Sequence, residues 1–160
     1  MERAVRNCTW SGDLWGMWLR HLEQLENSNF DDLIKLKENA ISVPWLTSQK
    51  PQLVKFYFSW LSICQAEIIT LDEESEEQEF LDEELNECLE QIGSGTPNSE
   101  LRSDTLLAFD YPEGYLLGKL VARLKTAMNK EDEARNIWNA MAPANGLRAD
   151  YWLERMTWER

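Results

Sequence analysis

The sequence predicts an all-α fold, built as a right-handed solenoid of antiparallel helix pairs. Apolar residues recur at three-and-four spacing in nearly every patterned segment, which indicates helices. Alternating β-branched runs bounded by tight turns, which would indicate strands, are almost absent. Pairs of expected helices also recur about every 40 residues, a period typical of two-helix solenoid repeats.

The first two expected helices flank a short polar break at Asn27-Ser28-Asn29. The first should run from about Gly12 to Glu26. Its spacing puts four large side chains on one face: Trp15, Trp18, Leu19 and Leu22. Ser28 or Asn29 can cap the second helix. That helix should end before Pro44, because the residue before a proline avoids helical angles.

The third helix should begin near Ser48, with Pro51 in its first turn. Its apolar stripe comprises Leu53, Phe56, Tyr57, Trp60, Leu61, Cys64 and Ile68. The fourth helix follows the acidic break 72–75, where Ser75 can act as the cap, and should stop at Gly93. One side of it is lined by Phe80, Leu81, Leu85, Cys88, Leu89 and Ile92.

Residues 93–104 combine Gly, Ser, Pro and Asn, a composition that predicts a flexible linker within the array. The fifth helix should start after it, with Asp110 as the cap and Pro112 in the first turn, and should end at Asn129. Its expected buried side comprises Tyr115, Leu116, Leu120, Leu124 and Met128.

The last two helices are separated by Pro143 and Gly146, which should break the sixth helix after residues 130–141. The seventh should start near Leu147 and still be running at Arg160. Residues 1–160 are therefore expected to be a fragment of a longer repeat array, with about three helix pairs and one further helix.

Aromatic residues mark the first helix of each pair, and small residues mark the second. The expected packing anchors are Trp15, Trp18, Tyr57, Trp60, Ala134, Trp138 and Trp152. Ala40, Cys88 and Ala134 occupy matching small positions, which would let neighbouring helices approach closely. An irregular bundle with coincidental aromatic spacing is the alternative.

Composition excludes several classes of function. Sixteen Lys and Arg against 29 Asp and Glu give a net charge of −13, which argues against binding nucleic-acid phosphates or anionic membranes. No apolar run is long enough to span a membrane, and the first residues lack the apolar core of a signal peptide. The three cysteines, at 8, 64 and 88, suggest reduced thiols in an intracellular protein.

Nothing in the sequence suggests an enzyme or a cofactor. The single histidine, His21, falls opposite the tryptophans of its helix and is expected at the surface. Cys64 and Cys88 lie on apolar stripes and are expected to be small core residues. No paired Cys or His spacing for zinc occurs, nor does a glycine-rich phosphate loop.

Two groups of residues are candidates for contacts with a partner. Trp10 and Trp45 fall outside the apolar stripes, in connecting segments. The segment 72–90 holds 11 carboxylates that would attract a basic partner, and the candidate contacts within it are Glu76, Glu77, Glu79 and Glu83. The alternative is that these carboxylates form a solvated helix face, as charge runs usually do.

The aromatic spacing, with Ala in the second helix, resembles the half-a-tetratricopeptide (HAT) repeat of RNA-processing scaffolds. Two stretches are similar to the HAT repeats of the U4/U6 snRNP recycling factors. They are residues 8–23 (CTWSGDLWGMWLRHLE) and 120–138 (LVARLKTAMNKEDEARNIW), continuing to YWLER at 151–155. The middle of the chain, 72–110, departs from that pattern.

The resemblance implies a nuclear protein-interaction scaffold in pre-mRNA splicing, with splicing or snRNP proteins as partners and a capacity to form homo-oligomers. It implies no cofactor, and the acidic charge argues against strong direct RNA binding. Two alternatives remain open. One is another HAT scaffold, of the crooked-neck or cleavage-stimulation-factor kind. The other is a tetratricopeptide-like adaptor with no link to RNA.

Overall fold

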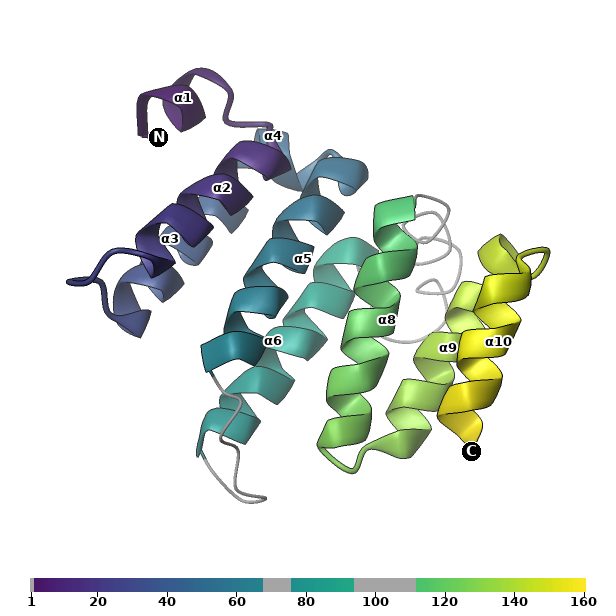
Figure 1. The fold of residues 1–160 in the computed structure, drawn as a ribbon. Helices are drawn as coiled ribbons and strands as arrows, with labels where there is room; N and C mark the ends of the chain where they lie inside the picture. The colour runs from purple at the N-terminus through teal and green to yellow at the C-terminus, as the bar shows by residue number, and fades with distance from the viewer. Residues whose placement is uncertain (1, 68–75, 94–111) are drawn as a thin grey trace. The chain divides into compact units, whose positions relative to one another are not determined.

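The computed structural model describes residues 2–67, 76–93 and 112–160, and in these ranges the protein is all-α (Figure 1). Helices hold 84% of the described residues and no strand occurs among them, so the predicted fold class is confirmed. The chain divides into two compact units, Met1–Glu84 and Leu85–Arg160, with the boundary inside one helix. The repeat solenoid stays a prediction.

In its described residues, the first unit contains two short helices, α1 and α4, each followed by two longer ones. In chain order, its helices are α1 (Glu2–Asn7), α2 (Gly12–Glu23), α3 (Phe30–Ile41), α4 (Pro44–Thr47), α5 (Lys50–Glu67) and the start of α6 (Glu76–Gly93). The sequence missed α1 and α4, because helices of four and six residues are too short to show a period. Pro44 favours α4, since its fixed φ suits the first helical position.

Of the two residues that could cap α3, Ser28 and Asn29, it is Asn29 that does so. The Asn29 side chain accepts a hydrogen bond from the backbone N–H of Asp32 at 2.9 Å. At the start of α2, the Ser11 hydroxyl accepts one from Leu14 at 3.3 Å. Helix α2 ends at Glu23, three residues before the expected Glu26.

Helices α2 and α5 lie side by side (Figure 1), and two glycines of α2 lie close to α5. A Cβ atom added at Gly12 would lie 1.8 Å from the carbonyl oxygen of Gln52. One added at Gly16 would lie 2.6 Å from the hydroxyl of Ser59. The backbone N–H of Gly12 also donates to the Gln52 side chain at 3.0 Å. Glycine is therefore required at Gly12, where the close atoms are backbone, whereas at Gly16 the Ser59 side chain could move aside.

Gly12→Ala should separate α2 from α5 and lower the free energy of unfolding by about 1–3 kcal/mol, as overpacked contacts do. Backbone atoms of Gln52 cannot swing away as a side chain could. Urea denaturation followed by circular dichroism would measure the loss. Gly16→Ala meets only the movable Ser59 side chain and should cost less. Equal stability of the wild type and Gly12→Ala would contradict this packing.

The second unit holds the end of α6 together with α8 (Pro112–Ala127), α9 (Glu131–Asn145) and α10 (Ala149–Glu159). Helix α8 is followed by Asn129 at φ 59°, a left-handed conformation that asparagine tolerates and that reverses the chain into α9. The predicted stop at Asn129 is therefore two residues past the last helical residue.

One expected boundary is wrong. Pro143 does not break the sixth expected helix, because α9 continues through it to Asn145. A proline inside a helix removes one N–H donor, but the neighbouring backbone bonds can remain. Beyond Pro143, the Asn145 side chain donates to the Met141 carbonyl at 3.1 Å, which ties the last turn to the one before it.

Buried apolar and aromatic side chains form the core of each unit. In the first unit they include Leu19, Leu46, Leu53, Phe56, Tyr57, Trp60 and Leu61. In the second they include Leu117, Val121, Ala134, Trp138, Met141 and Tyr151. Of the expected linker 93–104, Gly93 is the last residue of α6, and the rest lies outside the described residues, as do the expected caps Ser75 and Asp110.

Candidate functional site

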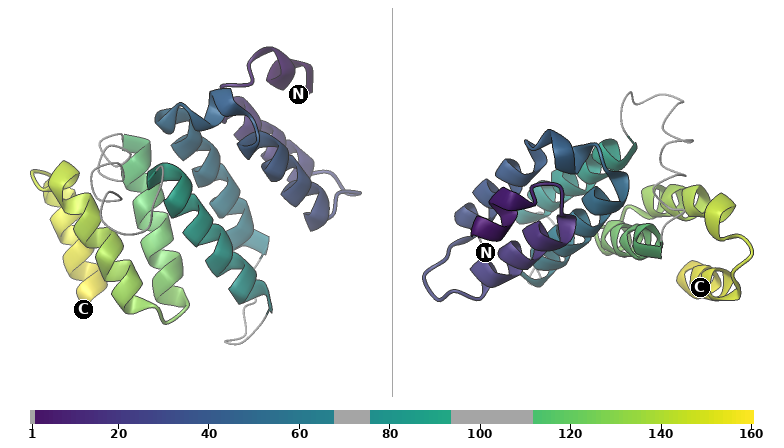
Figure 2. Two further views of the ribbon diagram at one scale, coloured as in Figure 1. Left: turned by 180° about the vertical axis from the view of Figure 1, so that it is seen from behind. Right: turned by 90° about the horizontal axis from the view of Figure 1, so that it is seen from above.

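Two exposed tryptophans lie at one end of the first unit. Trp10 sits in the turn between α1 and α2 and is 46% exposed, and Trp45 in α4 is 69% exposed. The α1–α2 connection and α4 lie at the same end of the unit in both views (Figures 1 and 2). Large aromatic side chains are costly to leave in water and often mark interaction sites. Their contact with a partner stays a prediction.

The four candidate carboxylates are all exposed on the first turns of α6: Glu76, Glu77, Glu79 and Glu83. None of them forms an ion pair with another described residue. Between them, Phe80 is half-buried and meets the ring of Phe30, the first residue of α3, edge to face at 5.7 Å. Phe30 in turn stacks on Trp60 at 6.0 Å. The exposed carboxylates at the start of α6 therefore flank the contact between Phe80 and Phe30.

A buried ion pair fixes α6 against α3 beneath this surface. Lys37 Nζ lies 3.0 Å from Glu84 Oε2, and the two side chains are only 4% and 10% exposed. The indole N–H of Trp60 donates to the same carboxylate oxygen at 2.7 Å. Buried charges are tolerated only when paired and hydrogen-bonded. These three residues therefore hold α3, α5 and α6 in register.

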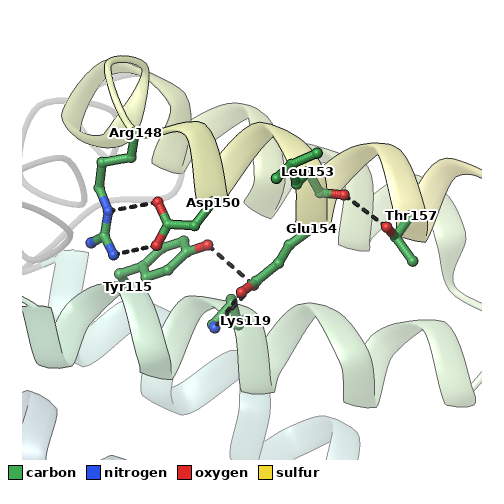
Figure 3. Close-up of polar contacts among 7 residues, drawn as sticks. All are labelled: Tyr115, Lys119, Arg148, Asp150, Leu153, Glu154 and Thr157. Atoms are coloured by element: carbon green, nitrogen blue, oxygen red, sulfur yellow. Dashed lines mark hydrogen bonds and ion pairs between the residues drawn. The ribbon is translucent and has the colours of Figure 1, made fainter.

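In the second unit, a polar cluster joins α8 to α10 (Figure 3). The Tyr115 hydroxyl donates to Glu154 at 3.1 Å, and Lys119 Nζ lies 2.9 Å from the same carboxylate. The Arg148 guanidinium lies 4.6 Å from the centre of the Tyr115 ring. Burial, and then the charge of Glu154, raise the pKa of Tyr115 above its ordinary value of 10.0. The phenol would keep its proton at neutral pH even with its ordinary pKa, and the shift extends its role as a donor to higher pH.

Arg148 also holds the first turn of α10. Its guanidinium donates two hydrogen bonds to Asp150, at 3.1 and 2.6 Å. These bonds lower the pKa of the Asp150 carboxyl below its ordinary value of 3.8. The fork geometry of arginine suits such two-point binding of a carboxylate.

The folded state should therefore lose this contribution of Asp150 in acid. Because its pKa is lower when folded than when unfolded, the contribution is complete above the unfolded pKa and disappears as the pH falls through the folded pKa. Asp150→Asn should lower the melting temperature at about pH 7, and the difference from wild type should shrink towards about pH 3. Asp31→Asn, also in a helix first turn, is the control. A difference that stays constant with pH would contradict the role of the Arg148 pair.

Helix α10 has large side chains on two faces, one packed against α8 and α9 and the other exposed to solvent. Tyr151 is fully buried, and its hydroxyl donates to the carbonyl of Trp138 at 2.7 Å. Trp158 packs on Trp138 at 6.3 Å and donates to Thr126 on α8 at 2.7 Å. The outward side carries Trp152, Leu153 and Met156, which are 43%, 64% and 52% exposed.

The structure thus differs from the expected role of Trp152 as a packing anchor. The neighbouring Tyr151 takes the inward position, and the helix rotates the next residue by about 100° to the outside. Of the other expected anchors, Trp18 is half-buried and stacks on Trp15 at 5.6 Å, whereas the rest are buried: Trp15, Tyr57, Trp60, Ala134 and Trp138. Trp158 was not identified from the sequence, although its seven-residue spacing from Tyr151 was a usable signal.

His21, Cys64 and Cys88 are the residues that the sequence offered for chemistry. His21 is exposed, and Cys64 and Cys88 are buried, both as expected. Within 2–67, 76–93 and 112–160, no group of three or more His, Cys, Asp or Glu is placed to hold a metal ion. In the same ranges, no helix is long and apolar enough to cross a bilayer.

Comparison with known proteins gives one distant similarity. Over 161 aligned residues, 99% of its length, the chain is 26% identical to "Spliceosome associated factor 3, U4/U6 recycling protein" of Danio rerio. The chain spans 16% of the length of that relative. No family model matches the chain, and no solved structure matches it. The similarity to this relative covers the whole chain at low identity, and the HAT repeats stay a prediction.

Proposed function

We propose that this chain is a protein-interaction scaffold in pre-mRNA splicing, a segment of HAT repeats from a nuclear factor of the U4/U6 recycling kind. The similarity along the whole chain to a spliceosome-associated U4/U6 recycling protein carries the proposal. The function is binding rather than catalysis, and it needs no cofactor. The partners are proteins of the splicing machinery.

Three packing features support a repeat architecture. The small residues at matching positions of the second helices, Ala40, Cys88 and Ala134, are all 0% exposed, as close helix packing requires. Each unit buries aromatic side chains from the first helix of a pair. The outward apolar stripe of α10 is the kind of face that stacked repeats cover with a neighbouring helix.

The charge supports protein partners over RNA. A scaffold that neutralised RNA phosphates would need basic surface, whereas this chain carries a net charge of −13. Exposed aromatic side chains such as Trp10 and Trp45 are typical anchors of protein interfaces instead.

Affinity purification from nuclear extract tests the proposal, with the whole chain as bait and both proteins and RNAs identified. Components of U4/U6 particles should be enriched. Trp10→Ala combined with Trp45→Ala should reduce that enrichment, whereas Met17→Ala, another exposed apolar residue of the same unit, should leave it unchanged. Enrichment of proteins with no splicing component would favour the alternative, a tetratricopeptide-like adaptor without a link to RNA.

A further inference from the structure

The α3–α6 face of the first unit offers an apolar contact that no described residue fully covers. Phe30 and Phe80 meet at 5.7 Å across the two helices, and both remain half-buried rather than buried. Trp60, which is buried, stacks on Phe30, and its indole N–H donates to Glu84. The pair is therefore packed on a buried ring through Phe30, and both residues keep part of their surface in solvent.

Carboxylates surround this aromatic pair. Asp31 follows Phe30 directly, and Glu76 and Glu83 lie four residues before and three residues after Phe80, on the same flank of α6. All three are exposed, and none forms an ion pair with another described residue. Residues 1–84 contain 17 acidic and 7 basic residues, so the charge of the whole unit, −10, strengthens the local field.

We infer that the α3–α6 face, centred on Phe30 and Phe80, docks a basic peptide segment of a partner protein that carries an apolar or guanidinium side chain onto the rings. The carboxylates would attract and orient the segment, and the two phenylalanine rings would add a short-range packing contact, which charge attraction does not provide. Arginine suits both parts, because its guanidinium pairs with carboxylates and also stacks on aromatic rings. The sign of the field disfavours anionic occupants such as RNA. The inference rests on the proposed scaffold role and specifies the class of partner for one face.

The test uses the whole purified chain and a short synthetic fluorescent peptide of alternating Arg and Leu, with binding followed by fluorescence anisotropy. Glu76→Gln combined with Glu83→Gln should weaken binding by about tenfold, and added salt should weaken binding to the wild type. Glu131→Gln combined with Asp132→Asn is the matched control, since it removes the same charge from exposed positions of α9. The control should bind within about twofold of wild type.

The contribution of the rings is tested on the peptide, so that no variant needs to fold. A peptide of alternating Arg and Ser keeps the charge and the guanidinium groups but loses the aliphatic side chains, and a peptide of alternating Lys and Ser also loses the guanidinium groups. Affinity should fall at each step, from Arg-Leu to Arg-Ser to Lys-Ser. Equal affinity for all three peptides, or an equal loss in both double variants, would overturn the inference, because it would show unspecific charge attraction.

This result is independent of the splicing assignment. Specific peptide binding together with a purification that yields no splicing component would retain the docking face and reject the proposed function. If the chain does not bind the peptide, and if Glu76→Gln and Glu83→Gln leave the recovery of splicing components unchanged, the proposed function is retained and the docking face is rejected.

Discussion

Replacing Glu84 with alanine should destabilise the first unit by about 3–5 kcal/mol, the usual cost of breaking a buried ion pair from one side. Lys37 would lose the carboxylate 3.0 Å from its ammonium group while the side chain stays 4% exposed. The indole N–H of Trp60 would lose its acceptor as well. Urea denaturation followed by circular dichroism would measure the change.

Glu83→Ala is the matched control, because the neighbouring carboxylate is exposed on the same helix and should change stability by about 0.5 kcal/mol or less. Glu84→Gln should fall between the two, since its amide oxygen can still accept from Trp60. Replacing both members of the pair, with Lys37→Met and Glu84→Leu, should recover much of the loss. If Glu84→Ala and Glu83→Ala unfold at the same urea concentration, the buried pair does not stabilise the fold.

The second large effect is expected at Trp138. Trp138→Ala should lower the free energy of unfolding by about 3–5 kcal/mol, because the side chain is 3% exposed and packs on Tyr151 at 5.8 Å and on Trp158 at 6.3 Å. Its indole nitrogen has no hydrogen-bond partner among the described residues. Trp138→Phe should therefore cost less than the lost volume suggests, since it also removes a buried unsatisfied donor.

Trp152→Ala provides the comparison on the adjacent helix. That indole is 43% exposed and donates to the Gly146 carbonyl at 2.8 Å, so its loss should cost about 1 kcal/mol. Thermal unfolding of the two variants would rank them. A cost at Trp152 equal to that at Trp138 would make Trp152 an anchor after all.

The helical period predicted all the long helices, because each buries one apolar stripe that is visible in the sequence. The burial of Trp60 and Trp138 followed from the same pattern, whereas the polar break before α3 left Ser28 and Asn29 both open as its cap. Helix α4 was missed because four residues show no period. Pro143 was misread because a proline usually ends a helix, and only tertiary contacts decide when the helix continues past it.

The buried polar groups were the least predictable part. Lys37 and Glu84 each lie on an apolar stripe, which was a visible anomaly, but nothing local shows that the two meet across helices. The same holds for Tyr115 and Glu154, which are 39 residues apart. Which distant residues pair depends on how the helices pack against one another. A single sequence does not specify that packing.

The turn between α9 and α10 is suited to carrying a label. Leu147 is fully exposed there, between Gly146 and Arg148. Exposed turn tips accept inserted segments more readily than any helix. Helix α10 is held at points beyond the turn, by the Tyr151 bond to Trp138 and the Trp158 bond to Thr126. A fluorophore or epitope placed at residue 147 would therefore report on the second unit while leaving the tryptophans and carboxylates of the first unit untouched.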